Sequence, residues 1–307
     1  MLEEKNRWEE KPVEVAFNSI TKRFPPDILA NNQVSFEVKK GTVHALLGEN
    51  GAGKTTLMNI LYGLLLPDEG EIIIRGKPTK ISSPREAINL GIGMVHQHFK
   101  LIPTHTVSEN IVLGLTSTPF FFPAEKAEFE IKSLSEKYGL KIDPRARVWQ
   151  LSAGEKQKVE ILKALYRRAN ILILDEPTSV LTPQEAEELF ATLRAMKEEG
   201  KTCIFITHKL NEVKEIADVV TVMRKGKVVS TTLPSQVSLE ELARMTVGKE
   251  VISVVPRKIT SDKTILQLQE VSAMGDRDFP ALLNISLTVR KGEIVGVAGI
   301  AGNGQKE

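Results

Sequence analysis

The stretch "GENGAGKT" at residues 48–55 constrains the fold more than any other part of the chain, because it matches the phosphate-binding pattern G-x-x-x-x-G-K-[ST] at every fixed position. The apolar run "TVHALL" before it predicts a buried strand, and "TTLMNILYGLL" begins a helical pattern after it. Backbone N–H groups of such a loop, with the positive end of the helix, surround phosphate oxygens. The stretch therefore predicts a strand–loop–helix unit that binds a phosphorylated ligand.

Further apolar runs predict the rest of an α/β domain. They are apolar along their whole length rather than alternating, as parallel strands covered on both faces tend to be. The runs are "ILIL" at residues 171–174, "TCIFIT" at 202–207 and "VVTVM" at 219–223. Longer helical patterns separate them, which favours an α/β architecture.

Local signals also predict where helices begin. Capping boxes, in which a hydroxyl and a glutamate three residues later exchange hydrogen bonds with free backbone N–H groups, are predicted at Ser83–Glu86, Thr106–Glu109 and Thr182–Glu185. The chain from about residue 98 to residue 170 is mostly helical in pattern. It predicts a helical lobe inserted between core strands.

Composition argues against several classes of protein. Lysine and arginine total 41 against 39 acidic residues, a net charge of +2, so no nucleic-acid partner is expected. The single cysteine, Cys203, lies in an apolar run, which predicts a buried core residue and a reducing compartment. No apolar run approaches the roughly 18 residues of a membrane span, and the charged start "MLEEKNRWEEK" lacks the apolar segment of a signal peptide. A cytoplasmic protein is therefore predicted, and work at a membrane would need a membrane partner.

Two acidic residues supply the second half of a nucleotide site. Asp175 ends the apolar run "ILIL", where a carboxylate can hold Mg²⁺, and Glu176 is placed to orient or activate an attacking water. Lys54 is predicted to reach the β- and γ-phosphates, and Thr55 to offer its hydroxyl to Mg²⁺. Such an acidic pair by itself could cap the following turn instead. Its combination with the phosphate-binding loop favours the nucleotide site.

The stretch "LSAGEKQKVEILKAL" begins at Leu151, shortly before Asp175, and opens a helix, so that Ser152 and the backbone of Gly154 can face an anion. Here the chain resembles the ATP-binding-cassette family, whose signature is written LSGGQ. The resemblance covers residues 13 to about 255, and its motifs occur in the family's order.

The resemblance implies a fold and further site residues. The implied fold is α/β, a P-loop NTPase cassette with a mixed central sheet, an antiparallel β edge and an inserted helical lobe. Gln97 in "VHQHF" matches the residue that senses the γ-phosphate and Mg²⁺ and touches the helical lobe, and His208 in "ITHKL" matches the histidine that contacts the γ-phosphate. Phe24 in "KRFPP" falls where the family stacks an aromatic ring on adenine, a contact that contributes roughly 1–3 kcal/mol.

The predicted site combines these motifs and takes ATP and Mg²⁺ as cofactors. Its catalytic residues are predicted to be Lys54, Gln97, Glu176 and His208. Its metal ligands are predicted to be Thr55, Gln97 and Asp175. Its nucleotide-binding residues are predicted to be Phe24, Gly48, Glu49, Asn50, Gly51, Ala52, Gly53, Lys54, Thr55, Thr56, Ser152 and Gly154. By contrast, His44, His96 and His98 have no metal-like partners at useful spacing and are predicted to be structural.

One position departs from the family's pattern. After the acidic pair the family usually has a loop that ends in aspartate, as in S-A-L-D, whereas this chain has "SVLT" and ends on Thr182. Threonine is a good helix N-cap, so the fold loses nothing. The aspartate's contact with the opposite nucleotide site is therefore not predicted here.

The chain also repeats itself. "FEVKKGTVHALLGENGAGKTT" matches "LTVRKGEIVGVAGIAGNGQKE", with a constant offset of 251 positions between Gly41 and Gly292, so that Gln305 falls where Lys54 stands. The repeat predicts a charged tail at 1–12, a first cassette at 13–253, a linker at 254–263 and the beginning of a second, degenerate cassette at 264–307. This last segment is expected to be poorly packed.

Tandem cassettes without a membrane segment resemble importers of simple sugars and nucleosides. The resemblance implies an ATPase subunit at the cytoplasmic face of the membrane, with integral-membrane permease subunits, an indirectly engaged extracytoplasmic solute-binding protein, and a second cassette in the same chain or by dimerisation. The alternatives are a cytosolic cassette protein that acts on ribosomes or DNA, and a regulatory nucleotide-binding module. The short linker and near-neutral charge disfavour the first, and the intact motifs disfavour the second.

Overall fold

The computed structural model describes residues 8, 10–115, 124–248, 262–274 and 280–299. The chain divides into two compact units, Met1–Val251 and Ile252–Glu307. Most of the predicted linker, and the final motif with Gln305, lie outside the described residues.

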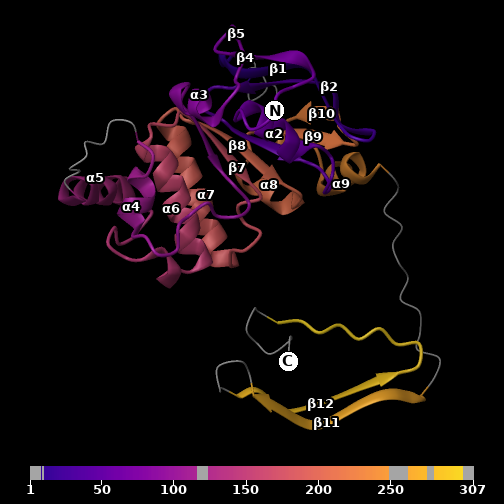
Figure 1. Ribbon diagram of the computed structural model, residues 1–307. Helices are drawn as coiled ribbons and strands as arrows, with labels where there is room; N and C mark the ends of the chain where they lie inside the picture. The colour runs from indigo at the N-terminus through magenta and orange to yellow at the C-terminus, as the bar shows by residue number, and fades with distance from the viewer. Residues whose placement is uncertain (1–7, 9, 116–123, 249–261, 275–279, 300–307) are drawn as a thin grey trace. The chain divides into compact units, whose positions relative to one another are not determined.

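A six-stranded sheet forms the centre of the first unit, with strand order β10–β9–β3–β8–β7–β6 (Figure 1). The strands are β3 (Val43–Leu47), β6 (Ile92–Val95), β7 (Ile171–Asp175), β8 (Thr202–Thr207), β9 (Val219–Arg224) and β10 (Lys227–Thr232). All but β10 pair in parallel and are almost entirely buried, which confirms the strands predicted from unbroken apolar runs. The edge strand β10 is antiparallel, so the sheet is mixed, as predicted.

A second, antiparallel sheet has the order β2–β1–β4–β5. Its strands are β1 (Val13–Phe24), β2 (Ile28–Lys39), β4 (Glu69–Ile74) and β5 (Lys77–Thr79). One apolar cluster joins this sheet to helix α2 (Lys54–Leu61) and to the parallel sheet, with Phe17, Leu57 and Ile173 as examples from the three elements. Because α2 is packed into this shared core, the residues at its start are held in place.

Helices α4 (Val107–Val112), α5 (Ala124–Lys137) and α6 (Ala153–Tyr166) come between β6 and β7 in the chain and gather at one end of the unit (Figure 1). A second apolar cluster joins them to helix α7 and strand β8. Further helical segments are α3 (Pro84–Asn89), η1 (Val148–Gln150), α7 (Pro183–Glu198), α8 (Leu210–Ile216), η2 (Pro234–Gln236) and α9 (Leu239–Val247).

Helix starts follow the predicted capping chemistry, with one correction. The boxes at Thr106 and Thr182 are fully formed, which confirms both. The prediction of a full capping box at Ser83 is wrong, because only one of its two hydrogen bonds forms. The Ser83 hydroxyl accepts from the Glu86 N–H, but the Glu86 carboxylate accepts from the backbone N–H and hydroxyl of Ser82. Because Ser82 offers two donors to the carboxylate, it replaces the single N–H that the box would have used.

The second unit contains an antiparallel hairpin of β11 (Thr264–Met274) and β12 (Pro280–Arg290). Many of its apolar side chains are exposed, including Ile265, Leu283 and Ile294. In the first unit, the apolar positions of β1 and β2 are buried against α2 and the parallel sheet. No comparable layer covers the hairpin among the described residues of its own unit.

The hairpin repeats a backbone feature of β1 and β2. Ser19 has φ +52°, and Glu270, which follows it by 251 positions, has φ +50°. The Ser19 N–H donates to Ser35 Oγ at 2.8 Å, and the Glu270 N–H donates to Ser286 Oγ at 3.0 Å. Both hairpins therefore hold a left-handed residue with a serine from the neighbouring strand.

Candidate nucleotide-binding site

The loop at residues 48–55 lies where only glycine fits at two positions. Gly53 has φ +95°, and a Cβ there would lie 2.2 Å from the carbonyl oxygen of Ala30 in β2. A Cβ on Gly48 would lie 2.4 Å from the carbonyl oxygen of Met223 in β9. Two strands thus approach the loop closely, which explains the glycines of the pattern.

Lys54 is the cation of the loop. Its side chain is 5% exposed, and its Nζ donates to the carbonyl oxygens of Gly48 at 2.8 Å and Glu49 at 2.9 Å. Burial lowers the pKa of Lys54, and the charges of Glu176, Asp175 and Glu49 oppose that shift. The ammonium is therefore partly desolvated and held by carbonyl groups, which suits it to pair with phosphate oxygens.

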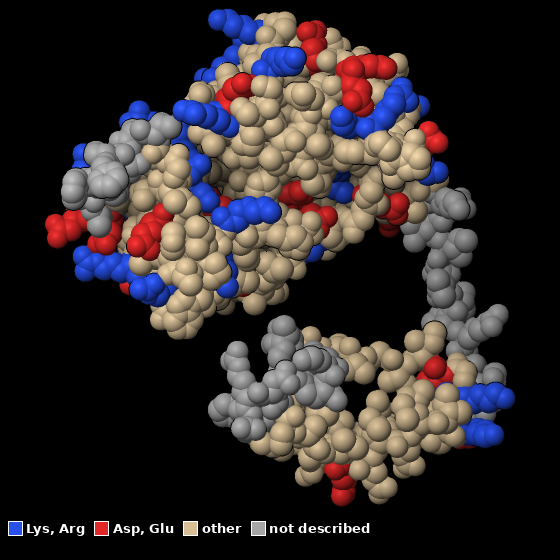
Figure 2. Space-filling model, viewed as in Figure 1, with Lys and Arg blue, Asp and Glu red and all other residues tan. Residues whose placement is uncertain are grey.

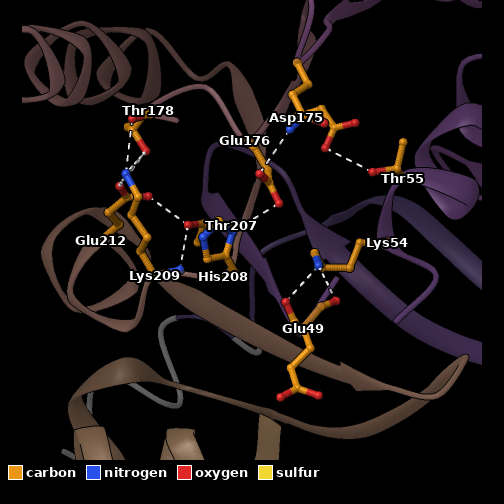
Figure 3. A network of polar contacts seen from close by, with 12 residues as sticks. Glu49, Lys54, Thr55, Asp175, Glu176, Thr178, Thr207, His208, Lys209 and Glu212 are labelled. Atoms are coloured by element: carbon orange, nitrogen blue, oxygen red, sulfur yellow. Dashed lines mark hydrogen bonds and ion pairs between the residues drawn. The ribbon is translucent and has the colours of Figure 1, made fainter. Parts of the chain in front are cut away.

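Asp175 and Thr55 form the second feature of the site (Figure 3). The Thr55 hydroxyl donates to Asp175 Oδ1 at 3.2 Å, and burial raises the pKa of the Asp175 carboxyl. Among the described residues, no group of three His, Cys, Asp or Glu side chains could hold a metal ion by itself. Mg²⁺ commonly binds one or two carboxylates together with phosphate oxygens, so this hydroxyl and carboxylate fit Mg²⁺ that arrives with a nucleotide.

Glu176 lies at the centre of a polar network (Figure 3). It has φ +46°, an unfavourable conformation for a residue with a side chain, and its N–H donates to the carbonyl of Ile206 at 3.1 Å. Its Oε1 contacts His208 Nδ1 at 3.1 Å, and its Oε2 accepts from Gln97 Nε2 at 3.4 Å. The structure thus brings three of the predicted catalytic side chains into contact, and the two partners hold the carboxylate from both oxygens.

A cavity of about 440 Å³ lies beside this network. It is lined by Phe24, Ile28, Leu29, Ala30, Asn50, Gly51, Ala52, Gly53, Lys54, Thr55, Thr56, Gln97 and Glu176. Most of the residues predicted to bind nucleotide therefore meet at one cavity. The predicted residues outside the lining include Gly48 and Glu49, whose carbonyls hold Lys54, and His208, which contacts Glu176.

Sequence reasoning missed two side chains here. Ile28 is 61% exposed and lines the cavity with Phe24, as an apolar contact for a flat ring would. Its place just after the "FPPD" turn is the one signal that could have indicated it. Asn31 is fully buried, and its Nδ2 donates to the carbonyl of Gly53 at 3.1 Å. Nothing in the sequence pattern separates Asn31 from the asparagine next to it.

The signature residues lie apart from the cavity. Ser152 caps α6, with its hydroxyl accepting from the Glu155 N–H and its own N–H donating to the Glu155 carboxylate. Gly154 is buried, and a Cβ there would lie 2.2 Å from Oε1 of Glu185. Neither residue lines the cavity at residues 48–55. Thr182 is occupied within its own helix start, since its hydroxyl donates to Glu185 Oε2 at 3.0 Å and accepts from the Glu185 N–H at 3.3 Å.

Comparisons with known proteins identify relatives of this chain. A family model described as ABC transporter matches residues 31–179. The glucose import ATP-binding protein TsgD13 of Haloferax volcanii is 48% identical over 94% of this chain and 58% of its own length. The nucleoside import ATP-binding protein NupA of Lactococcus lactis is 49% identical over 94% of this chain and 57% of its own length. The chain therefore spans little more than half the length of these relatives.

Solved structures show the same fold. The ADP conformation of MJ1267, an ATP-binding cassette of an ABC transporter, has a TM-score of 0.67 and 26% identity, covering 78% of this chain and 97% of that one. The dimeric structure of MJ0796, a bacterial ABC transporter cassette, has a TM-score of 0.64 and 28% identity, covering 72% of this chain and 98% of that one. Together with the loop, the acidic pair and the mixed sheet, these likenesses confirm the predicted cassette fold, and the chain belongs to the ABC transporter ATPase family.

Proposed function

We propose that this chain binds and hydrolyses ATP to power the import of a nucleoside or a simple sugar through separate permease subunits. One observation supports the proposed binding and hydrolysis of ATP. Lys54, Thr55, Gln97 and Glu176 line one cavity, the Asp175 carboxylate accepts a hydrogen bond from the Thr55 hydroxyl, and His208 contacts Glu176.

Each of these residues has a role that its position supports. On nucleotide binding, Lys54 would exchange the carbonyls of Gly48 and Glu49 for β- and γ-phosphate oxygens, and Phe24 with Ile28 would contact the base. Thr55, Asp175 and Gln97 would hold Mg²⁺, which neutralises phosphate charge when bound.

The chemical step falls to Glu176. Its carboxylate would orient a water molecule toward the γ-phosphate and accept a proton from that water, since the side chain lines the cavity. Gln97 and His208 would fix the orientation of that carboxylate, because each contacts one of its oxygens.

The proposed import role is supported by the descriptions of the relatives, and it requires membrane-spanning partner subunits. Matched relatives are described as import ATP-binding proteins for glucose, nucleosides and guanosine. Among the described residues, no helix is both long and apolar enough to cross a bilayer. We place the chain at the cytoplasmic face of the membrane, where it would dock on permease subunits and engage a solute-binding protein only through them. Basic and acidic side chains intermingle on the face of the first unit that Figure 2 draws, which gives no support there to a nucleic-acid partner.

A second cassette completes the proposal. The 251-position offset and the matching left-handed residues Ser19 and Glu270 support residues 264–307 as the start of a second, degenerate cassette after a linker. A related cassette is solved as a dimer. The signature at Ser152 and Gly154, which does not line the cavity at 48–55, would then close the nucleotide site of a partner cassette.

The test measures ATP hydrolysis with and without co-expressed permease subunits of the same transporter. Stimulated hydrolysis that drives solute uptake into vesicles is the expected result. Hydrolysis that ribosomes or DNA stimulate, but a permease does not, would support the cytosolic alternative instead. Nucleotide binding without turnover under every condition would support the regulatory alternative.

A further inference from the structure

We propose that Glu212 is a positioning residue for ATP hydrolysis, a clamp that ties the segment after Glu176 to the segment before His208. The inference rests on the proposed function, because it concerns how the two proposed catalytic side chains are kept in contact. Glu212 lies on α8 and does not line the nucleotide cavity.

The clamp is a set of short contacts around one carboxylate (Figure 3). The Thr178 hydroxyl donates to Glu212 Oε1 at 2.5 Å, and the Thr207 hydroxyl donates to Glu212 Oε2 at 2.8 Å. Lys209 Nζ lies 3.1 Å from the same Oε1 and also donates to the carbonyl of Thr178 at 3.1 Å. Both carboxylate oxygens are therefore used, and the Lys209 ammonium balances the charge.

The two threonines lie at the places where a clamp would matter. Thr178 comes two residues after Glu176 and is buried, and Thr207 comes directly before His208 and is buried. Strand β7, which precedes Thr178, and strand β8, which ends at Thr207, pair in parallel as far as Asp175, beyond which the strand ladder no longer holds the two segments together. Past that point, the Glu176 N–H bond to the carbonyl of Ile206 and the Glu212 clamp join the two segments.

The chemistry makes the clamp strong. The Glu212 side chain is 11% exposed, so its hydrogen bonds are shielded from competing water. Hydrogen bonds to a charged group contribute more than neutral ones, and buried donors that lose a carboxylate acceptor are left unsatisfied. Without the clamp, fewer contacts would join the segments that carry Glu176 and His208, and their 3.1 Å contact would be populated for less of the time.

The first test compares steady-state ATP hydrolysis and nucleotide affinity of the whole chain. Glu212→Ala is expected to lower kcat by about tenfold or more, as expected from the loss of a hydrogen bond to a charged group. KM and the Kd for a fluorescent ATP analogue should stay within about twofold, because Glu212 does not touch the cavity. Thr178→Val, which removes a hydroxyl at nearly constant shape, should likewise lower kcat and leave KM and Kd unchanged. Thr178→Ser, which keeps a hydroxyl, should have a higher kcat than Thr178→Val, close to that of the wild type.

Two controls separate positioning from general damage. Glu215 lies on the same helix as Glu212 and forms a surface ion pair with Arg194 at 3.0 Å. Because surface ion pairs contribute little, Glu215→Gln should leave kcat unchanged. In a His208→Ala background, Glu212→Ala should cost less than about twofold, since residues that act through one another are not additive. A full, additive loss in that background would overturn the proposal, as would an unchanged kcat in Glu212→Ala.

A second measurement holds even if the chain does not hydrolyse ATP, in which case the proposed function fails on its own. Amide hydrogen exchange in Glu212→Ala should rise about tenfold or more in residues 176–181 and 207–212, and stay unchanged in α6. Unchanged exchange in those two segments would refute the clamp, whatever the activity.

Discussion

Acidification is expected to weaken the sheet that carries the phosphate-binding loop, through a single buried histidine. His44 is fully buried on β3, the strand that leads into Gly48. Its Nε2 contacts the Thr221 hydroxyl at 2.8 Å, and its ring lies 5.5 Å from that of Phe36. Burial lowers the pKa of His44 to about 3, because removal from solvent disfavours the charged imidazolium.

The size of the effect follows from that shift. In the unfolded chain the imidazole titrates near pH 6.5, so between pH 6.5 and about 3 only the unfolded state takes up the proton. The stability from neutral His44 is therefore complete above the unfolded pKa and is lost as the pH falls toward the folded pKa. Linkage gives a loss of about 2 kcal/mol between pH 7 and pH 5 from this group alone. In a unit of this size, that loss lowers Tm by about 4–8 °C.

The assay compares thermal unfolding of the wild type and His44→Leu by circular dichroism at pH 7 and pH 5. Other groups titrate in both proteins, so the measured quantity is the difference between the two pH shifts. His44→Leu should be less sensitive to acid by about 2 kcal/mol, whereas the exposed His98→Leu should match the wild type. An equal pH shift in His44→Leu and the wild type would refute the argument.

Five further results are expected. Lys54→Ala should abolish most ATP binding in an equilibrium titration, because no other described side chain in the cavity lining carries a positive charge for the phosphates, while Asp175→Asn should abolish Mg²⁺-dependent turnover. Glu176→Gln should still trap nucleotide but turn over roughly 10²-fold more slowly; an unchanged rate would move the catalytic role to His208. Gln97→Ala should bind ATP yet fail to drive uptake with the permease, and normal transport would remove it from the coupling path. Adding a complete second cassette should raise turnover of the chain, and equal rates with and without it would contradict a composite site.

Local sequence signals determined much of this protein. The spacing of glycines and lysine at 48–55 requires a strand before it and a helix after it, and the structure has both. Unbroken apolar runs marked β7, β8 and β9, since a strand covered on both faces has no polar side. Cys203 was predicted to be core and is fully buried, where burial raises its thiol pKa to about 12. These features depend on residues within a few positions of one another, so the chain alone specifies them.

Contacts between distant residues were decided by the tertiary structure. The acidic pair indicated Glu176 and the family motifs indicated Gln97 and His208, but their meeting depends on strand order, because β6, β7 and β8 are neighbours in the sheet. Ile28 lines the cavity and Asn31 contacts Gly53 because β2 approaches the loop closely.

The sequence pattern also could not predict which of several nearby donors would bond to a given carboxylate. The Glu86 carboxylate accepts from Ser82 rather than from Ser83, because a hydroxyl and an N–H together outweigh one N–H. Glu212 carried no motif at all, and two threonines from separate strands give it a role. Sequence patterns report the conformation of a segment, whereas the partners of a polar side chain depend on which segments the fold brings beside it.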